Sequence, residues 1–512
     1  MVARAVTFPP QAHARVRRTF SPDLVARVRR RITLAASTRV WADGRLIAGG
    51  SPWRLSSLHG GLADLVRRLS EDSRGLELDD CDERFGEVLI QRGLANPEPH
   101  PARTFTQSDV CLVIPVRDDP DGLRACLMSL PNIDAIVVDD ASTDPDSLML
   151  AISQCRERSR ANIRVIRLDV NVGPSEARNR GIAECRHPLV LLMDADCVAK
   201  PGWPTDVLHY FDDPAVDVVA PRVVPGNGGA NAGEFIAAPL DMGTQEGWVR
   251  PGSRIPFVPT AALVARKEIL TAHGFDPELR LGEDVDLIWR IHDCGGGVRF
   301  DPRCTVIHRT RSSTWLWLRR MHEYGTSAAV LSERHPERLV AADVSFWNLL
   351  SICAATMGEL KVGLGVQIFA SARLHDALRD SGAPWETTIY LARSGLVSDG
   401  RSLGSALRRE WWPVGLVALA AAPWSRTGRR LTALTLSPLV QDYTSRARNE
   451  GIVPYVIARY LSDIAYGTGV MTAAIRHRAA RPLLPRVRWP RVTRRPPARP
   501  APPRGNAPSS QR

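Results

Sequence analysis

The chain has 512 residues, of which 44% are hydrophobic and 24% are charged, and its formal net charge at pH 7 is +12. This length exceeds what one hydrophobic core organises, so we expect two or three folded units. The charge does not indicate nucleic-acid binding, because eleven arginines and no acidic residue follow Asp463, which leaves the remainder of the chain nearly neutral.

Nine cysteines are scattered along the chain, and no two of them form a C-x-x-C pair. The odd count and the wide spacing indicate reduced thiols in a cytoplasmic setting and argue against a zinc site. The N-terminus lacks the apolar segment of a signal peptide. Two uncharged apolar stretches, 344–356 and 411–425, fall short of the ~20 residues that span a bilayer, so a full membrane crossing is not expected.

Residues 1–20 are polar and are expected to be loose, and a small α+β module is predicted over 21–95. Short strand-like runs separated by glycine turns precede two amphipathic helices. The strand-like runs are 31–34, 45–47 and 53–55, and the helices are 61–69 and 81–92. This order resembles a winged helix, which leaves three roles open: a structural cap, a peptide-binding domain or a DNA-binding wing. Acidic residues crowd the start of the second helix and disfavour the last role.

Prolines make residues 96–107 a stiff linker, and the pattern changes beyond it. Apolar strand-like runs alternate with helical spans of 10 to 15 residues. The strands are 110–114, 133–138, 163–168, 189–193 and, later, 297–307, and the helices are 122–130, 147–157, 174–185 and 285–293. Such alternation predicts βαβ units and a parallel sheet, so residues 108–330 are expected to form a nucleotide-binding α/β domain.

Carboxylates follow the predicted strands of this domain. Asp194 and Asp196 come directly after the apolar run 189–193, and Asp139 and Asp140 close the second strand. Ligands of open α/β sheets bind outside the carboxyl ends of the strands. The chain has neither a G-x-G-x-x-G motif nor a P-loop to hold phosphates. A diphosphate would therefore be held through a divalent cation, and oxygen ligands suit Mg²⁺ or Mn²⁺.

Five motifs identify a family. They are VIPVR at 113–117, VDDASTD at 138–144, NVGPSEARNRG at 171–181, DAD at 194–196 and GEDVDL at 282–287. Their order and spacing resemble those of the family 2 inverting glycosyltransferases of the GT-A fold, over about residues 108–320. The resemblance implies a Rossmann-like GT-A domain, a UDP-sugar donor and a divalent metal.

The resemblance also implies roles for individual residues. The catalytic pair would be Asp284, as the base that takes the acceptor proton, and Glu283. The metal ligands would be Asp196 and His308. Donor-binding residues would be Pro115, Arg117, Asp139, Asp140, Gly173, Arg178, Asn179 and Asp194. Structural roles compete for three of them: Asp140 as a helix N-cap, Arg178 in a salt bridge and His308 as a core histidine.

The overall layout resembles, more narrowly, the glycosyltransferases of the mycofactocin system, which add glucose to a redox cofactor derived from a ribosomal peptide. The implied acceptor is a peptide-derived small molecule that receives a short β-linked glycan. The processive Q-x-x-R-W motif is absent, which disfavours polymer export. Transfer to a polyprenyl, lipid or cell-envelope acceptor is the alternative, and a non-catalytic nucleotide-sugar sensor is a third reading. Trp248, Trp315 and Trp317 could stack on a sugar or an acceptor, or be buried in the core.

Residues 331–480 are predicted to form a helical extension. Its segment 411–424 is apolar with tryptophans at both ends, and arginines follow. This pattern is typical of a helix at the surface of an anionic membrane, so we expect peripheral association with the cytoplasmic side of the cell membrane. A buried helical hairpin in a soluble cytoplasmic protein is the alternative. Residues 481–512 are rich in proline and arginine and are expected to be a disordered tail.

Overall fold

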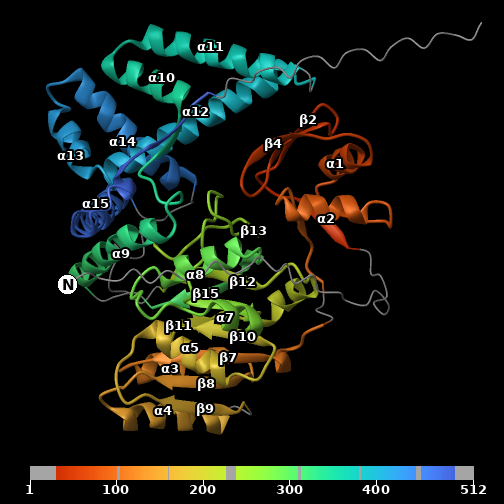
Figure 1. Ribbon diagram of the computed structural model, residues 1–512, viewed down its shortest axis with the longest axis vertical. Coiled ribbons are helices and arrows are strands. Elements are labelled where there is room, and N and C mark those ends of the chain that lie inside the picture. The colour runs from red at the N-terminus through yellow and green to blue at the C-terminus, as the bar shows by residue number, and fades with distance from the viewer. Residues whose placement is uncertain are drawn as a thin grey trace, which may run out of the picture.

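The computed structural model describes residues 30–100, 104–158, 161–226, 238–309, 313–379, 382–445 and 451–490. The predicted loose N-terminus, 1–20, lies outside the described residues. Figure 1 shows three parts: a small N-terminal module with α1 and α2, a central sheet flanked by helices, and a group of C-terminal helices.

The N-terminal module has two three-stranded sheets, with strand orders β5-β1-β6 and β2-β3-β4. Its strands are β1 (Arg31–Leu34), β2 (Arg39–Trp41), β3 (Leu46–Gly49), β4 (Arg54–Ser57), β5 (Leu76–Glu77) and β6 (Ala95–Pro97), and its helices are α1 (Gly61–Glu71) and α2 (Glu83–Gln91). The predicted runs and helices of this module are confirmed. The predicted linker starts too early, however, because Asn96 and Pro97 pair with β1.

The central sheet has nine strands in the order β11-β15-β12-β14-β10-β7-β8-β9, with β13 paired to β15. The strands are β7 (Val110–Val116), β8 (Asp134–Asp139), β9 (Ile163–Arg167), β10 (Leu189–Met193), β11 (Cys197–Ala199), β12 (Val218–Pro225), β13 (Gly247–Trp248), β14 (Ala262–Arg266) and β15 (Val298–His308). Strands β7 to β10 are mutually parallel, as predicted. The expectation of a parallel sheet is wrong beyond them, because β14 runs antiparallel to both β10 and β12. An apolar run buried on both faces does not encode strand direction.

Helices cover both faces of this sheet. Alternate residues of β7 show this: Leu112 and Ile114 join one apolar cluster, and Cys111 and Val113 join the other. The first cluster contains residues of α3 (Pro120–Ser129) and α4 (Pro145–Arg158), and the second contains residues of α5 (Pro174–Glu184), α7 (Lys267–His273) and α8 (Glu283–Asp293). A strand buried on both faces has no solvent side, which explains why its sequence does not alternate. The domain is thus a three-layer α/β structure.

The C-terminal region is helical, as predicted. Its helices are α9 (Thr314–Arg334), α10 (Phe346–Met357), α11 (Leu360–Leu378), α12 (Trp385–Arg408), α13 (Trp412–Ala421), α14 (Arg426–Ser445) and α15 (Ile452–His477). Helix α9 crosses α15 closely, since a Cβ on Gly325 would meet the Tyr466 carbonyl oxygen at 2.0 Å. In the part of the chain that the structure describes, none of the helices has both the length and the apolar character needed to cross a bilayer.

The expectation of disorder from Arg481 onward is wrong for residues 481–490. Strand β17 (Arg486–Arg488) pairs in parallel with β16 (Asp343–Ser345), and Val487 packs in the same apolar cluster as Val344. Arg488 also reaches the buried Asp399 carboxylate at 2.7 Å. Composition alone misses this segment because its partners lie far away along the chain. The remainder of the predicted tail, 491–512, lies outside the described residues.

Trp248 joins the N-terminal module to the central domain. Its indole Nε1 donates a hydrogen bond to the Ile90 carbonyl oxygen at 2.6 Å, and its own carbonyl accepts one from Ser51 Oγ at 3.0 Å. Arg299 adds a hydrogen bond to Asn96 at 3.0 Å. The Trp248 side chain is therefore buried at this junction, and of its two predicted fates the structure shows the buried one.

Candidate active site

The turn after β10 carries the first two acidic side chains of the site. Asp194 N donates to the Ala261 carbonyl oxygen and Cys197 N donates to the Asp194 carbonyl oxygen, each at 3.1 Å, so the chain turns tightly from β10 into β11. The side chains of Asp194 and Asp196 remain 30% and 36% exposed. Both carboxylates can therefore meet a ligand at the carboxyl end of the sheet.

His308 closes β15 directly beside Asp196. Strand β11 pairs antiparallel with β15, which sets Cys197 opposite His308. The His308 Nε2 lies 3.3 Å from the Asp196 Oδ2. Two ligands in adjacent positions around Mg²⁺, each at 2.0 to 2.1 Å from the ion, are about 3 Å apart. The predicted metal ligands are thus brought together at a separation that fits one divalent cation.

Arg178 of α5 links the turn that carries Asp194 and Asp196 to the start of α8. Its Nη2 lies 2.5 Å from Asp194 Oδ1 and its Nη1 lies 3.3 Å from Glu283 Oε1. Burial opposes the charge of this guanidinium, but Asp194 and Glu283 outweigh burial and raise the pKa of Arg178 above its ordinary value. The guanidinium also lies over the Phe275 ring, 5.3 Å from its centroid. One buried cation therefore holds the two acidic motifs in the same site.

Asp284 lies in the first turn of α8. The helix starts after Gly282, whose φ is 79° and whose Cβ, if present, would lie 2.9 Å from Leu331 on α9. Glycine therefore allows both the left-handed turn and the close approach of α9. Burial, followed by the negative charge of Glu283, raises the pKa of Asp284 to about 7. A carboxylate with a pKa near neutrality is suited to act as a general base.

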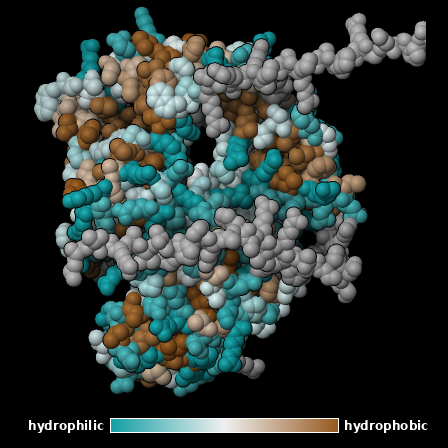
Figure 2. Space-filling model, in the orientation of Figure 1, coloured by the Kyte–Doolittle hydropathy of each residue, from teal (hydrophilic) through white to brown (hydrophobic). Residues whose placement is uncertain are grey.

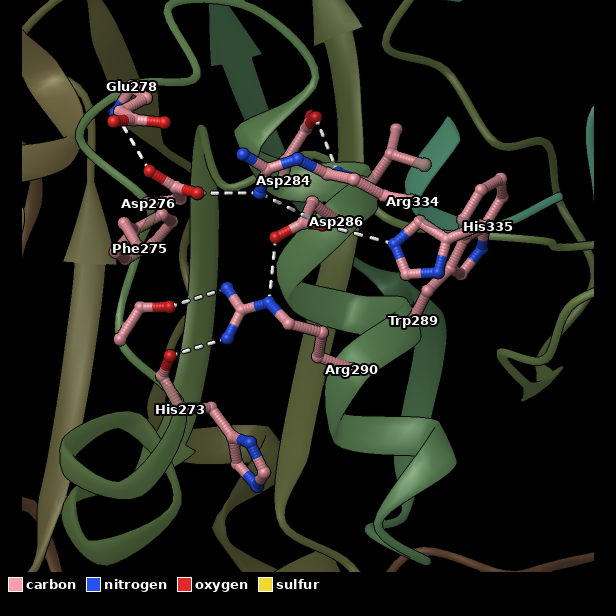
Figure 3. A network of polar contacts seen from close by, with 12 residues as sticks. His273, Phe275, Asp276, Glu278, Asp284, Asp286, Trp289, Arg290, Arg334 and His335 are labelled. Carbon is pink, nitrogen blue, oxygen red and sulfur yellow. Dashed lines mark hydrogen bonds and ion pairs between the residues drawn. The ribbon is translucent and has the colours of Figure 1, made fainter. Parts of the chain in front are cut away.

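Asp286, two residues after Asp284, has a structural role. Figure 3 shows it between Arg290 and His335. Its Oδ2 accepts from Arg290 Nε at 2.7 Å and its Oδ1 lies 3.0 Å from His335 Nε2. Arg290 in turn donates to the carbonyl oxygen of Gly274 at 2.7 Å. This network anchors α8 to α7 and to the end of α9, so Asp286 supports the helix that carries Asp284.

The predicted donor-binding residues Asp139 and Asp140 have internal partners. Asp140 accepts hydrogen bonds from the backbone N–H groups of Val172 at 2.7 Å and Gly173 at 2.9 Å. Asp139 is buried and accepts from Arg167 at 2.6 Å. These contacts hold the segment that precedes α5, which begins at Pro174 after Gly173 with a φ of 88°. A contact of either carboxylate with a donor stays a prediction.

The remaining predicted donor-binding residues differ in whether their side chains already have internal partners. Asn179 uses both its amide atoms on Phe275, donating to its carbonyl and accepting from its N–H at 2.8 Å each. The amide therefore positions the segment before α8. Pro115 is half-buried near the end of β7, and the exposed Arg117 has its Nε 3.5 Å from Asp118.

Sequence reasoning missed two supporting residues. Arg309 follows the candidate ligand His308 and reaches Asp119 at 3.1 Å, which joins the end of β15 to the start of α3. His335 supports Asp286, as described above. Arg309 could have been noticed in the sequence because it directly follows a candidate metal ligand. The sequence carries no comparable signal for His335.

A pocket borders His308 on the side of α9. It is lined by Val224, Pro225, Ala238, Pro239, Leu240, His308, Trp317, Arg320, Met321 and Tyr324. The Trp317 ring is 2% exposed, and its Nε1 has no hydrogen-bond partner among the described residues. Trp315, in contrast, is 72% exposed. Trp317 is therefore buried in an apolar cluster, as Trp248 is, and it also lines this pocket.

The family model described as glycosyl transferase family 2 matches residues 111–273. The pre-mycofactocin glycosyltransferase of Mycobacterium tuberculosis, strains CDC 1551 and H37Rv, is 33% identical over 468 residues, which cover 88% of this chain and 96% of that protein. Succinoglycan biosynthesis protein ExoU of Rhizobium meliloti is 29% identical over 37% of this chain and 61% of its own. Among solved structures, mannosyltransferase PcManGT from Pyrobaculum calidifontis in complex with GDP-Man and Mn²⁺ is 15% identical, covers 67% of this chain and 90% of that chain, and has a TM-score of 0.36.

Proposed function

This chain belongs to the family 2 glycosyltransferases, and on that premise we propose that it transfers a hexose, which we take to be glucose, from a UDP-sugar to a mycofactocin precursor. The acceptor is supported by the 33% identity to the pre-mycofactocin glycosyltransferase over most of both chains. We propose that the reaction inverts the anomeric carbon and needs Mg²⁺ or Mn²⁺. Repeated transfer would build a short β-linked glycan.

The observation that carries this proposal is the bridge made by Arg178 between Asp194 and Glu283. Inverting displacement needs a base on one face of the sugar and a stabilised leaving group on the other. Asp284, next to Glu283, is the base that takes the proton of the acceptor hydroxyl. Asp196 and His308 are the residues that would hold the cation. A divalent cation bound there supplies positive charge that stabilises the departing diphosphate.

The pocket beside His308 has a volume of about 20 Å³, too small to enclose a peptide-derived molecule, and is our candidate for one wall of the acceptor site. It combines the buried Trp317 indole and Tyr324 with the Arg320 guanidinium. Aromatic walls with a few polar groups are typical of small-molecule sites.

Mass spectrometry of the products tests the proposed function. The full-length protein is incubated with a mycofactocin precursor, Mn²⁺ or Mg²⁺ and a panel of UDP- and GDP-sugars. We expect one or more hexose additions with UDP-glucose, and at least about 100-fold slower addition with Asp284→Asn. Transfer from GDP-sugars alone would contradict the assigned donor, and transfer to a polyprenyl phosphate but not to the precursor would favour the lipid-acceptor alternative.

We also propose that the C-terminal helices bind the surface of an anionic membrane on its cytoplasmic face. Figure 2 shows hydrophobic residues gathered over these helices. On α11 the exposed side chains include Leu360, Val362, Leu364, Ile368 and Phe369, each more than half exposed. Leu360, Leu364 and Ile368 recur at every fourth position and form one exposed apolar stripe along α11. A stripe of this kind is typical of an interaction surface.

Co-sedimentation with vesicles tests this attachment. We expect binding to vesicles that contain phosphatidylserine, and loss of binding in the double variant Leu364→Glu and Ile368→Glu, whose positions lie on one side of α11. Val170→Glu is the matched control, since Val170 is 66% exposed on the central domain. Equal sedimentation of the double variant and the control would remove α11 from the proposed surface.

A further inference from the structure

Three metal-binding side chains that lie at separate places in the sequence meet at the amino-terminal edge of the central sheet. Cys111 is the second residue of β7, Cys185 follows α5, and His187 precedes β10. One ligand atom from each lies within 4.8 Å of the other two. Strands β7 and β10 are parallel and in register, so this cluster lies at the edge opposite to the candidate active site.

The two ring nitrogens of His187 have different surroundings. Its Nε2 lies 3.5 Å from the Asp134 Oδ2, at the start of β8. Its Nδ1 is buried and has no hydrogen-bond partner within the described ranges. A buried polar atom without a partner destabilises the folded state. Metal-binding histidines contact a carboxylate or carbonyl with the nitrogen that does not bind the metal. Asp134 therefore fits as the residue that orients the ring, and Nδ1 fits as the ligand atom.

The cluster is open on one side to a pocket. This pocket is lined by residues that include Cys111, Asp134, Arg164 and His187. Three protein ligands with an open fourth position are typical of zinc sites that also bind water. The pocket gives an ion a path of entry and leaves room for that fourth ligand.

We propose that Cys111 Sγ, Cys185 Sγ and His187 Nδ1 bind one Zn²⁺ ion, with Asp134 holding the imidazole in position. Two sulfur ligands and one imidazole favour zinc over the hard cations Mg²⁺ and Mn²⁺, so this site is chemically distinct from the one at Asp196 and His308. The ion would join the start of β7 to the segment between α5 and β10. The sequence argument against zinc considered close cysteine pairs, whereas here the strand register brings distant residues together.

Cobalt binding tests the proposal. The parent is the full-length Asp196→Asn protein, in which the candidate active-site ligand set is impaired, kept reduced with a phosphine. We expect one equivalent of Co²⁺ to produce a sulfur-to-metal charge-transfer absorption that Zn²⁺ abolishes by displacement. Cys185→Ser should lose this absorption. Cys304→Ser is the matched control, because Cys304 is also buried in the central domain and should leave the absorption unchanged. Absence of the absorption in the parent would overturn the proposal.

A second variant avoids the risk that a buried cysteine substitution unfolds the domain. The Asp134 side chain is 44% exposed, and Asp134→Asn keeps all three ligands. Loss of such an orienting carboxylate lowers metal affinity by about 10- to 100-fold, and competition with a chromogenic chelator measures this. Unchanged zinc affinity would overturn the assignment of Nδ1 as the ligand. A disulfide between Cys111 and Cys185 in air, together with no metal binding under reducing conditions, would show a redox pair in place of a zinc site.

Discussion

The Nη2 atom of Arg178 lies 2.5 Å from the Oδ1 atom of Asp194, and the Arg178 side chain is only 4% exposed. The same guanidinium reaches Glu283 at the start of α8. This arrangement connects the turn that holds the candidate metal ligands with the helix that presents the candidate base. The geometry of the site thus depends on one buried ion pair network.

Replacing Arg178 by alanine should destabilise the protein by about 3 kcal/mol, because it leaves two carboxylates near the interior without their cation. Urea unfolding at pH 7 measures this loss. Arg180→Ala is the matched control on the same helix, since Arg180 is 64% exposed and pairs with Glu176 one turn away. Such an exposed pair contributes roughly 0.3 to 0.5 kcal/mol. Similar losses in the two variants would contradict the bridging role of Arg178.

Asp284→Asn should lower the rate of sugar transfer by about 10²- to 10⁴-fold, because an amide cannot take the proton of the acceptor. UDP affinity should change by less than about threefold, since the base acts on the acceptor and not on the donor. Calorimetry and a transfer assay measure the two quantities. Asp293→Asn, at the far end of the same helix, should leave both near the parent values. Undiminished turnover in Asp284→Asn would remove this residue from the role of base.

The pH dependence of transfer should follow the pKa of Asp284, which burial and Glu283 raise to about 7. The base is active only as a carboxylate, so kcat/KM should rise about tenfold per pH unit below 7 and level off above it. A profile of kcat/KM from pH 5 to pH 9 shows this. A profile that is flat from pH 5 upward would mean that the base has an ordinary carboxylate pKa.

The same pKa predicts a change in stability. Between the ordinary carboxylate pKa of 3.8 and about 7, the folded protein holds a proton that the unfolded chain has released, so this group makes stability fall as pH rises through that window. Asn at position 284 has no such charge. The Asp284→Asn variant should therefore melt at a higher temperature than the parent at pH 8, and the gap should close toward pH 4. Calorimetric scans at both pH values measure it, and an equal gap at pH 4 and pH 8 would contradict the titration.

His308→Ala should raise the Mn²⁺ concentration that gives half-maximal transfer by about 10-fold or more, because it removes one protein ligand from the proposed cation. The nitrogen lost is the one that lies 3.3 Å from Asp196. Activity after dialysis against a chelator, titrated with Mn²⁺, measures the change. His477→Ala, on an exposed turn of α15, is the control. An unchanged metal requirement in His308→Ala would return His308 to a purely structural role.

Local patterns predicted much of this structure. The apolar run 189–193 is a strand buried on both faces, and helical spacing placed α5 and α8 within two residues of their observed bounds. What sequence could not give are contacts between distant segments. The residues around Asp286 do not predict its contact with His335, and those around Cys111 do not predict its approach to His187. In each case another element brings the partner into contact when it packs. The antiparallel β14 was missed for a related reason, since pairing direction depends on the path of the chain between strands.

Trp248→Phe should loosen the N-terminal module without unfolding the central domain. Phenylalanine keeps most of the buried ring but removes the N–H that donates to the Ile90 carbonyl at 2.6 Å, which leaves that carbonyl with the hydrogen bond from the Gly93 N–H at 2.8 Å and breaks its link to the central domain. Cleavage by a protease in the segment between β6 and β7 should then become faster, while the melting temperature of the central domain changes little. If the module also helps to bind the acceptor, the acceptor KM should rise with UDP-sugar hydrolysis unchanged. Trp315→Phe is the control, because Trp315 is 72% exposed and lies on α9. Equal cleavage rates in the two variants would show that the remaining contacts, such as that of Arg299 with Asn96, hold the module in place without Trp248.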